Sequence, residues 1–195
     1  MKKLITFVLI VSLLTPAVSL GQTDTIKSGM LPTNPLYFLK TIKEEILLFF
    51  TFNQLKKASA LINYADTRTA EIESLEEKGR ADKIPKTLSR YEKQLSKALD
   101  IIEKNNDKKE IDDILINARE ATSKHITVLN RVLAFVPENA KDAIKHAIET
   151  SQKGQTKVIQ ILQGKNINQV LDKLKKVFPT KKTTTKKTKK KKKKK

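Results

Sequence analysis

The chain has 195 residues, which fits a single domain, and its 40 lysines and arginines against 21 aspartates and glutamates give a formal net charge of +19. It contains no cysteine, which excludes disulfide bonds, thiolate metal ligands and a lipid-modified cysteine. No segment alternates between apolar and polar residues for long enough to predict a strand, so we expect an all-α fold.

Residues 1–21 have the pattern of a secretory signal peptide. A basic end, an apolar run and a group of small residues at the cleavage position follow one another: Lys2 and Lys3, Leu4–Leu14, and Ala17–Ser19. An uncleaved membrane anchor is the alternative, although the apolar run is short for a span. We therefore predict an extracytoplasmic mature protein (secreted, periplasmic or cell-surface), which starts with a flexible lead-in over residues 22–30.

The first mature helix is predicted from Pro35 to about Phe50. Asn34 is a suitable N-cap, and Pro35 then occupies the first helical position, where its missing N–H is not needed. The segment Ile46–Phe50 is apolar on every side, so we expect it to be buried all round. It is too short to span a membrane.

A second helix is predicted from Phe52 to Lys78. Thr51–Gln54 matches a capping box, and Gly79 is a suitable left-handed C-cap. Arg68 lies within the apolar seam of this helix. A buried guanidinium must find a carboxylate or carbonyls, so we expect a structural ion pair; a side chain that reaches solvent and an anion site are the alternatives.

Two further helices follow. The third is expected to be capped by Asp82, with Pro85 in its first turn and an apolar seam from Ile84 to Ile102. The fourth is predicted from about Lys109 to Ala134. His125 lies in the seam of the fourth helix, and we expect it to be partly buried with one hydrogen bond.

Pro137 ends the pattern of the fourth helix, and a fifth helix is predicted after it, to about Gln163. Ser151 and Gly154 are small residues on its buried face, which indicates a close approach of another helix, unless Gly154 breaks the helix. An amphipathic C-terminal helix is then predicted within residues 165–179. It could pack on the bundle or lie on an anionic membrane surface.

Residues 180–195 form a lysine-rich tail that we expect to be disordered. Its 11 lysines are Lys181, Lys182, Lys186, Lys187, Lys189, Lys190, Lys191, Lys192, Lys193, Lys194 and Lys195. Without these and the two lysines of the leader, the net charge of the chain is only +6. Such a tail would bind a polyanion in a salt-sensitive manner that ignores sequence.

We expect the partners of the tail to be anionic envelope polymers or lipid headgroups. Nucleic acid is a less favoured partner because no aromatic side chains are interleaved with the lysines to stack on bases. A solubilising end with no dedicated partner is the remaining alternative.

The sequence offers little catalytic chemistry. It has no glycine-rich phosphate loop and no nucleophile elbow. Its two histidines, His125 and His146, are not spaced as a ligand pair on one helix face. We therefore expect no enzymatic activity, no cofactor and no metal; a metal sensor in which the two histidines, or one of them with two carboxylates, converge is an alternative.

Several segments resemble an uncharacterised family of exported bacterial all-helical proteins, a domain-of-unknown-function family. The opening LPTNPLYFLK, the helix Lys56–Arg68, the segment Lys124–Leu129 (KHITVL) and the segment Val136–Gly154 carry the resemblance. It implies an extracytoplasmic helical domain over about residues 31–154 and no known activity. If these segments share a structural role, Arg68 and His125 are expected to form a paired polar contact in the core.

These patterns together predict a single antiparallel bundle of about five to six helices. The bundle domain is expected over residues 31–164. The predicted function is that of a non-enzymatic envelope protein held by its cationic tail. The alternative is a periplasmic or surface helical module that binds a protein partner, which would require an exposed apolar groove around Phe49, Phe50 and Phe52.

Overall fold

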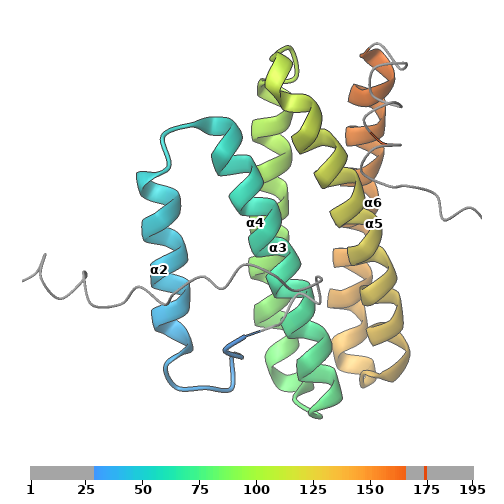
Figure 1. Ribbon diagram of the computed structural model, residues 1–195. Coiled ribbons are helices and arrows are strands. Elements are labelled where there is room, and N and C mark those ends of the chain that lie inside the picture. The colour runs from blue at the N-terminus through green and yellow to red at the C-terminus, as the bar shows by residue number, and fades with distance from the viewer. Residues whose placement is uncertain (1–28, 166–173, 175–195) are drawn as a thin grey trace, which may run out of the picture.

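The computed structural model describes residues 29–165 and residue 174, and this part of the chain consists of helices joined by turns and loops, with no strand (Figure 1). The predicted signal peptide, most of the lead-in and of the C-terminal helix, and the lysine tail lie outside the described residues. The helices are α2 (Tyr37–Phe50), α3 (Gln54–Glu77), α4 (Ile84–Lys104), α5 (Asp112–Phe135) and α6 (Glu138–Gly164), with single 3-10 turns at Ala81–Lys83 and Lys109–Ile111. The predicted all-α antiparallel bundle is confirmed.

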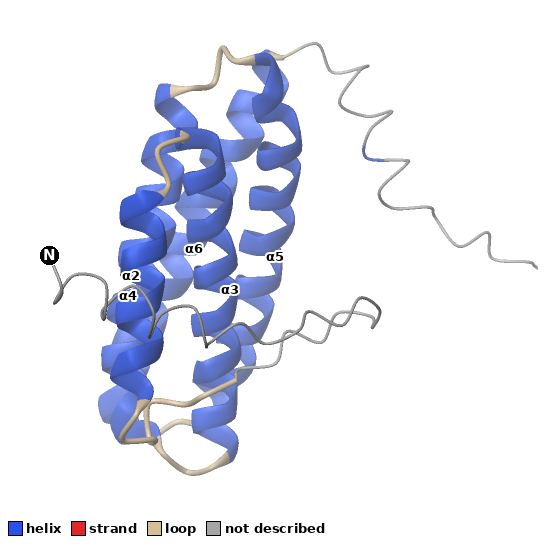
Figure 2. Cartoon of the chain, turned by 60° about the vertical axis from the view of Figure 1, so that its left-hand side comes forward, coloured by secondary structure: helices blue, strands red, loops and turns tan. Residues whose placement is uncertain are grey.

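Helices α3 to α6 form a four-helix bundle. Helix α3 packs on α4 and α5, and α6 packs on the same two helices, so the four surround one core. Figures 1 and 2 show them running side by side along the long axis of the molecule. The connections between them are short, which favours antiparallel neighbours in chain order.

The core is built from the apolar stripe of each helix. In α4, residues three and four apart are fully or almost fully buried: Ile84, Leu88, Tyr91, Leu95, Ala98, Leu99 and Ile102. This stripe matches the predicted seam, and Pro85 occupies the first turn as expected. Apolar periodicity therefore sets both the position of the helix and the face that it buries.

The predicted close approach at Gly154 is confirmed. A Cβ atom at Gly154 would lie 2.7 Å from Leu99 Cδ1 of α4, and Ser151 beside it is completely buried. Helix α6 continues through Gly154 without a break. The missing side chain thus lets α6 approach α4 at this level.

Three predicted caps differ from the structure. Helix α2 begins two residues after Pro35, because Asn34 uses its Oδ1 to accept from the Leu36 amide at 2.8 Å in a turn. The N-cap of α3 is Asn53 and not Thr51, since Asn53 Oδ1 accepts from the Lys56 amide at 3.0 Å. The carboxylate of Asp82 makes no cap bond to α4.

Asp82 instead binds neighbouring cations. Its two oxygens accept from Arg80 Nε and Nη2 at 2.9 and 3.0 Å, and Lys83 lies 3.2 Å away. The hydrogen bonds from Arg80 lower the pKa of Asp82 from its ordinary value to about 2. The predicted Gly79 cap is confirmed, with φ of +64° and the Arg80 amide bonded to the Leu75 carbonyl at 2.8 Å.

Helix α2 stands beside the bundle (Figure 1), and its burial is the main correction to the sequence analysis. The segment Ile46–Phe50 was expected to be buried, but Phe49 and Phe50 are 74% and 64% exposed. The buried residues of α2 are Tyr37 and Glu44. The helix thus presents a polar side to the bundle and an apolar side to the outside. Within residues 29–165, no helix is both long enough and apolar enough to cross a membrane.

Candidate functional site

A buried ion pair joins α2 to the bundle. Arg68 of α3 has no exposed surface, and its Nη2 donates to Glu44 Oε1 of α2 at 2.6 Å. The predicted structural ion pair of Arg68 is therefore confirmed. It lies between two helices that are otherwise joined by few apolar contacts.

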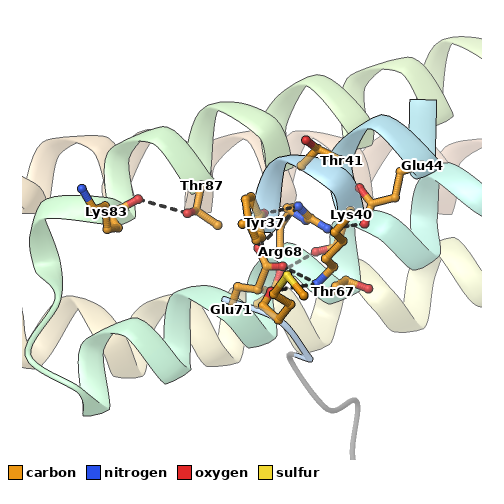
Figure 3. A network of polar contacts seen from close by, with 12 residues as sticks. Tyr37, Lys40, Thr41, Glu44, Thr67, Arg68, Glu71, Lys83 and Thr87 are labelled. Atoms are coloured by element: carbon orange, nitrogen blue, oxygen red, sulfur yellow. Dashed lines mark hydrogen bonds and ion pairs between the residues drawn. The ribbon is translucent and has the colours of Figure 1, made fainter. Parts of the chain in front are cut away.

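Glu71 and Tyr37 extend this pair into a network, which we name the α2 network (Tyr37, Lys40, Glu44, Arg68 and Glu71; Figure 3). The Tyr37 hydroxyl donates to Glu71 Oε2 at 2.8 Å and accepts from Arg68 Nη1. Lys40 Nζ donates to the other oxygen of Glu71 at 2.6 Å. Two cations and two carboxylates balance, which is what a buried charge cluster requires.

Electrostatics within this network follow from burial. Burial raises the pKa of Glu44 above its ordinary value, and the nearby cations Arg68 and Lys40 oppose that rise. Burial and the Glu71 carboxylate likewise raise the pKa of Tyr37. The ring of Tyr37 also lies under Arg90 of α4, whose guanidinium carbon is 5.1 Å from the ring centroid. The phenol therefore stays protonated and serves as a bridge between α2, α3 and α4.

A second polar cluster lies inside the four-helix bundle, and we name it the core network (Asp66, Tyr91, His125 and Ser151). His125 of α5 is 1% exposed. Its Nε2 lies 2.5 Å from Asp66 Oδ1 on α3, and its Nδ1 lies 3.1 Å from Tyr91 Oη on α4. Tyr91 Oη is in turn 2.5 Å from Ser151 Oγ on α6. One polar chain thus joins all four helices.

Two orders of donors and acceptors fit this chain, and the first keeps the hydrogen bond from Ser151 to its own helix. In the first order, Ser151 Oγ donates to the Ala147 carbonyl at 2.7 Å, so it accepts from the Tyr91 hydroxyl. Tyr91 Oη then accepts from His125 Nδ1. In the second order, Tyr91 Oη donates to His125 Nδ1, and Ser151 Oγ donates to Tyr91 instead of to the Ala147 carbonyl.

The predicted polar pair, Arg68 and His125, is divided between these two networks. Both residues are buried in the seams of their helices, as the sequence analysis expected for Arg68. Their side chains, however, bind different partners: Arg68 binds residues of α2 and of its own helix, whereas His125 binds Asp66 and Tyr91. His125 is also more buried, and has more hydrogen bonds, than expected.

The second histidine, His146, belongs to neither of the two networks. His146 is on the surface of α6, where its Nδ1 lies 2.7 Å from Glu92 Oε1 of α4. Within residues 29–165, no cluster of three or more histidines and carboxylates is placed to hold a metal ion. The structure does not bring His125 and His146 into one network, and the eleven tail lysines lie outside the described residues.

Sequence reasoning missed the partners Glu44, Glu71, Tyr91 and Ser151. Glu44, Tyr91 and Ser151 are on other helices than the residues they bind, 24 to 60 positions away. Glu71, in contrast, is three residues after Arg68 on α3, a spacing that places the two on one helix face. One signal was present for α2: Tyr37, Lys40 and Glu44 are spaced i, i+3 and i+7, which places them on one polar face. That face is the one that meets Arg68.

A model of DUF5667, a domain of unknown function, matches residues 29–139, which is more than half of the chain. The chain belongs to the DUF5667 family. This confirms the resemblance to an uncharacterised family. The DUF5667 match runs from the turn before α2 to the first residues of α6, so it includes the whole α2 network and, of the core network, all but Ser151. Comparison with the curated proteins and with the solved structures gave no match.

Proposed function

We propose that this DUF5667 protein is a non-enzymatic, exported protein of the cell envelope, held at an anionic surface by its lysine tail. The observation that carries the proposal is the segregation of charge. Residues 29–165 hold 23 lysines and arginines against 19 acidic residues, a net charge of +4, whereas the last 15 residues hold 11 lysines and no acidic residue. The positive charge is thus concentrated at one end of the chain.

The interior of the bundle agrees with a structural role. Its buried polar side chains bind one another across helices: Arg68 with Glu44, and His125 with Asp66. Networks of this kind fix the register of neighbouring helices. In this proposal the bundle is the folded body, and the tail supplies the contact with acidic surface polymers or lipid headgroups.

The test compares tail variants by fractionating cell envelopes over a salt series. The eleven lysines are changed together to glutamine in one variant and to arginine in a matched control, so that length is kept and only one variant loses charge. We expect the native and arginine chains to leave the envelope fraction as salt rises from about 0.05 to about 0.5 M, because screening shortens the range of the charges. The glutamine chain should be released already at low salt. Equal retention of all three would overturn the proposal.

A second candidate function, a helical module that binds a protein partner, is favoured by one observation. Phe49, Phe50 and Phe52 are 74%, 64% and 82% exposed, as that function requires. Pull-down with the native chain and with a Phe49→Ser, Phe50→Ser variant tests it: a specific protein partner should be lost with the phenylalanines. A metal-sensing function and extracellular nucleic-acid binding stay predictions without such an observation.

A further inference from the structure

The side of α2 that faces away from the bundle is a continuous apolar surface, which we name the outer face of α2. Its members are large side chains that are each about half exposed or more: Leu36, Phe38, Leu39, Ile42, Ile46, Leu47, Phe49 and Phe50. Figure 1 shows α2 at the edge of the molecule, with the described part of the chain on one side of it only. Apolar patches of this kind mark interaction sites.

The residues of the outer face share about half of the helix circumference, at 3.6 residues per turn. Lys43 is the one charged residue inside this arc, and Glu45 lies at its border. The opposite side carries Tyr37, Lys40 and Glu44, whose partners are in the bundle. Because the polar side is bound to the bundle, the apolar side is the one that the described part of the chain leaves open to a partner.

We propose that the outer face of α2 docks on an anionic membrane surface, with the helix lying in the plane of the interface. The helix has 14 residues, about 21 Å, which is shorter than the ~30 Å hydrocarbon core of a bilayer. An amphipathic helix of this kind buries its apolar side at the boundary between headgroups and acyl chains.

Charge complementarity favours anionic lipid. A cleft of about 530 Å³ between α2, α3 and α4 includes Phe49 of the outer face. Four cations line it, Lys57, Arg90, Lys93 and Lys97, against two carboxylates, Glu44 and Glu45, so the cations are in excess. Phe52, just after the helix, lines a second depression together with Lys56, Lys108 and one acidic residue, Glu110. Basic side chains beside a row of phenylalanines would lie at the level of the acidic headgroups while the rings enter the acyl region.

Other occupants fit less well. The face is made of Phe, Leu and Ile, and it lacks the Tyr, Trp and Arg that anchor protein interfaces. A second copy of the chain would bury Lys43, whereas at a lipid surface this side chain can reach the headgroups. Leu174, the one described residue beyond 165, lies beside Ile116 and Gln155 of α5 and α6, away from α2.

This inference deepens the proposed function, on which it rests for the presence of an anionic surface. It adds an apolar contact through α2 to the electrostatic contact through the lysine tail.

The sequence contains no tryptophan, so a single introduced indole reports its own surroundings. The full-length chain is prepared with Phe49→Trp, and with Phe135→Trp as a matched control, because Phe135 at the end of α5 is 70% exposed. Both are mixed with vesicles of phosphatidylglycerol and phosphatidylcholine, and with vesicles of phosphatidylcholine alone.

We expect the emission of the indole at position 49 to shift to the blue, and to be quenched by brominated acyl chains, with the anionic vesicles. The indole at position 135 should show neither effect. Adding Ile46→Lys to the Phe49→Trp chain should weaken its partitioning roughly tenfold, since an apolar contact is replaced by a charge. Because Ile46 is exposed, this variant should keep the circular dichroism of the native fold.

Three results would overturn the inference: no shift at position 49 while the protein sediments with the vesicles, an equal shift with neutral vesicles, or a concentration-dependent shift without vesicles, which would assign the face to a second copy. Repeating the experiment with the glutamine tail separates the two proposals. Quenching at position 49 that survives this change supports α2 docking even if the tail proves to have no role.

Discussion

Arg68 of α3 and Glu44 of α2 are joined by a 2.6 Å ion pair in which the guanidinium is completely buried. The pair lies on the polar side of α2, while the apolar side of the same helix faces outward. Helix α2 is therefore held to the bundle mainly by charges and hydrogen bonds, in contrast to α3–α6, which share an apolar core.

Replacing the charged side chain of Arg68 by an apolar one should strongly destabilise the fold. Arg68→Met leaves Glu44 and Glu71 without their buried cation, and the free energy of unfolding should fall by about 3–5 kcal/mol. Arg131 is a matched control, because it pairs with Glu73 from an exposed position; Arg131→Met should cost less than about 1 kcal/mol. Urea unfolding followed by circular dichroism measures both, and similar losses for the two variants would contradict the importance of the buried pair.

Helix α2 should open before the rest of the bundle. Its outer face is in solvent and few of its apolar side chains join the core, so local opening needs less free energy than global unfolding. Native-state hydrogen exchange should therefore show weaker protection for Tyr37–Phe50 than for Ile84–Lys104. Equal protection of the two helices would mean that α2 is an integral part of the bundle.

The core network should contribute to stability through satisfied hydrogen bonds. His125→Leu leaves the Asp66 carboxylate and the Tyr91 hydroxyl each short of one partner, which should cost about 1–3 kcal/mol. Thr122 on the same helix is also completely buried, but its hydroxyl bonds only to carbonyls of its own helix. Thr122→Val should consequently be much milder. Thermal unfolding of the two variants measures the difference, and a larger loss for Thr122→Val than for His125→Leu would contradict this role of the network.

The surface pair His146–Glu92 should be visible in a pH titration. The hydrogen bond and charge of Glu92 raise the pKa of His146 above its ordinary value of 6.5. The stabilisation from this pair is thus fully present below that value and is lost as pH rises through the higher pKa of the folded chain. Proton NMR of the imidazole should give a pKa above 6.5, and Glu92→Gln should lower it. An unchanged pKa in that variant would exclude Glu92 as the cause.

Gly154 should tolerate no branched side chain. Gly154→Val would drive its Cβ against Leu99, which is 8% exposed, and overpacking of this kind costs about 1–3 kcal/mol. Gly164, at the end of the same helix, has nothing within 4 Å of an added Cβ, so Gly164→Val should leave the unfolding midpoint in urea unchanged. If both variants unfold at the same midpoint, α6 does not need the close approach.

The positions of the helices could be read from the sequence because each is marked by its apolar period. The stripe of α4 from Ile84 to Ile102 predicted both the helix and its buried face. Arg68 was expected to have a buried partner, since a charge inside such a stripe cannot remain unpaired. These inferences depend only on residues close together in the chain.

The orientation of α2 could not be read in the same way. Periodicity shows that Ile46 and Phe50 share a face with other apolar residues, but it does not say whether that face meets the bundle or something else. The decisive contact, from Glu44 to Arg68, joins two helices and depends on the tertiary fold. The same holds for His125, whose partners Asp66 and Tyr91 lie on two other helices.

The link between α2 and α3 has a consequence for what happens when α2 leaves the bundle. Only Thr51–Asn53 connect the two helices, a span of about 10 Å at full extension. A departing α2 therefore remains tethered next to Arg68, at an effective concentration of the order of millimolar. Re-docking of α2 on the bundle therefore competes with any external ligand that binds the polar side of the opened helix. A ligand that binds the outer face of α2 does not face this competition, because that face is exposed while the helix is docked.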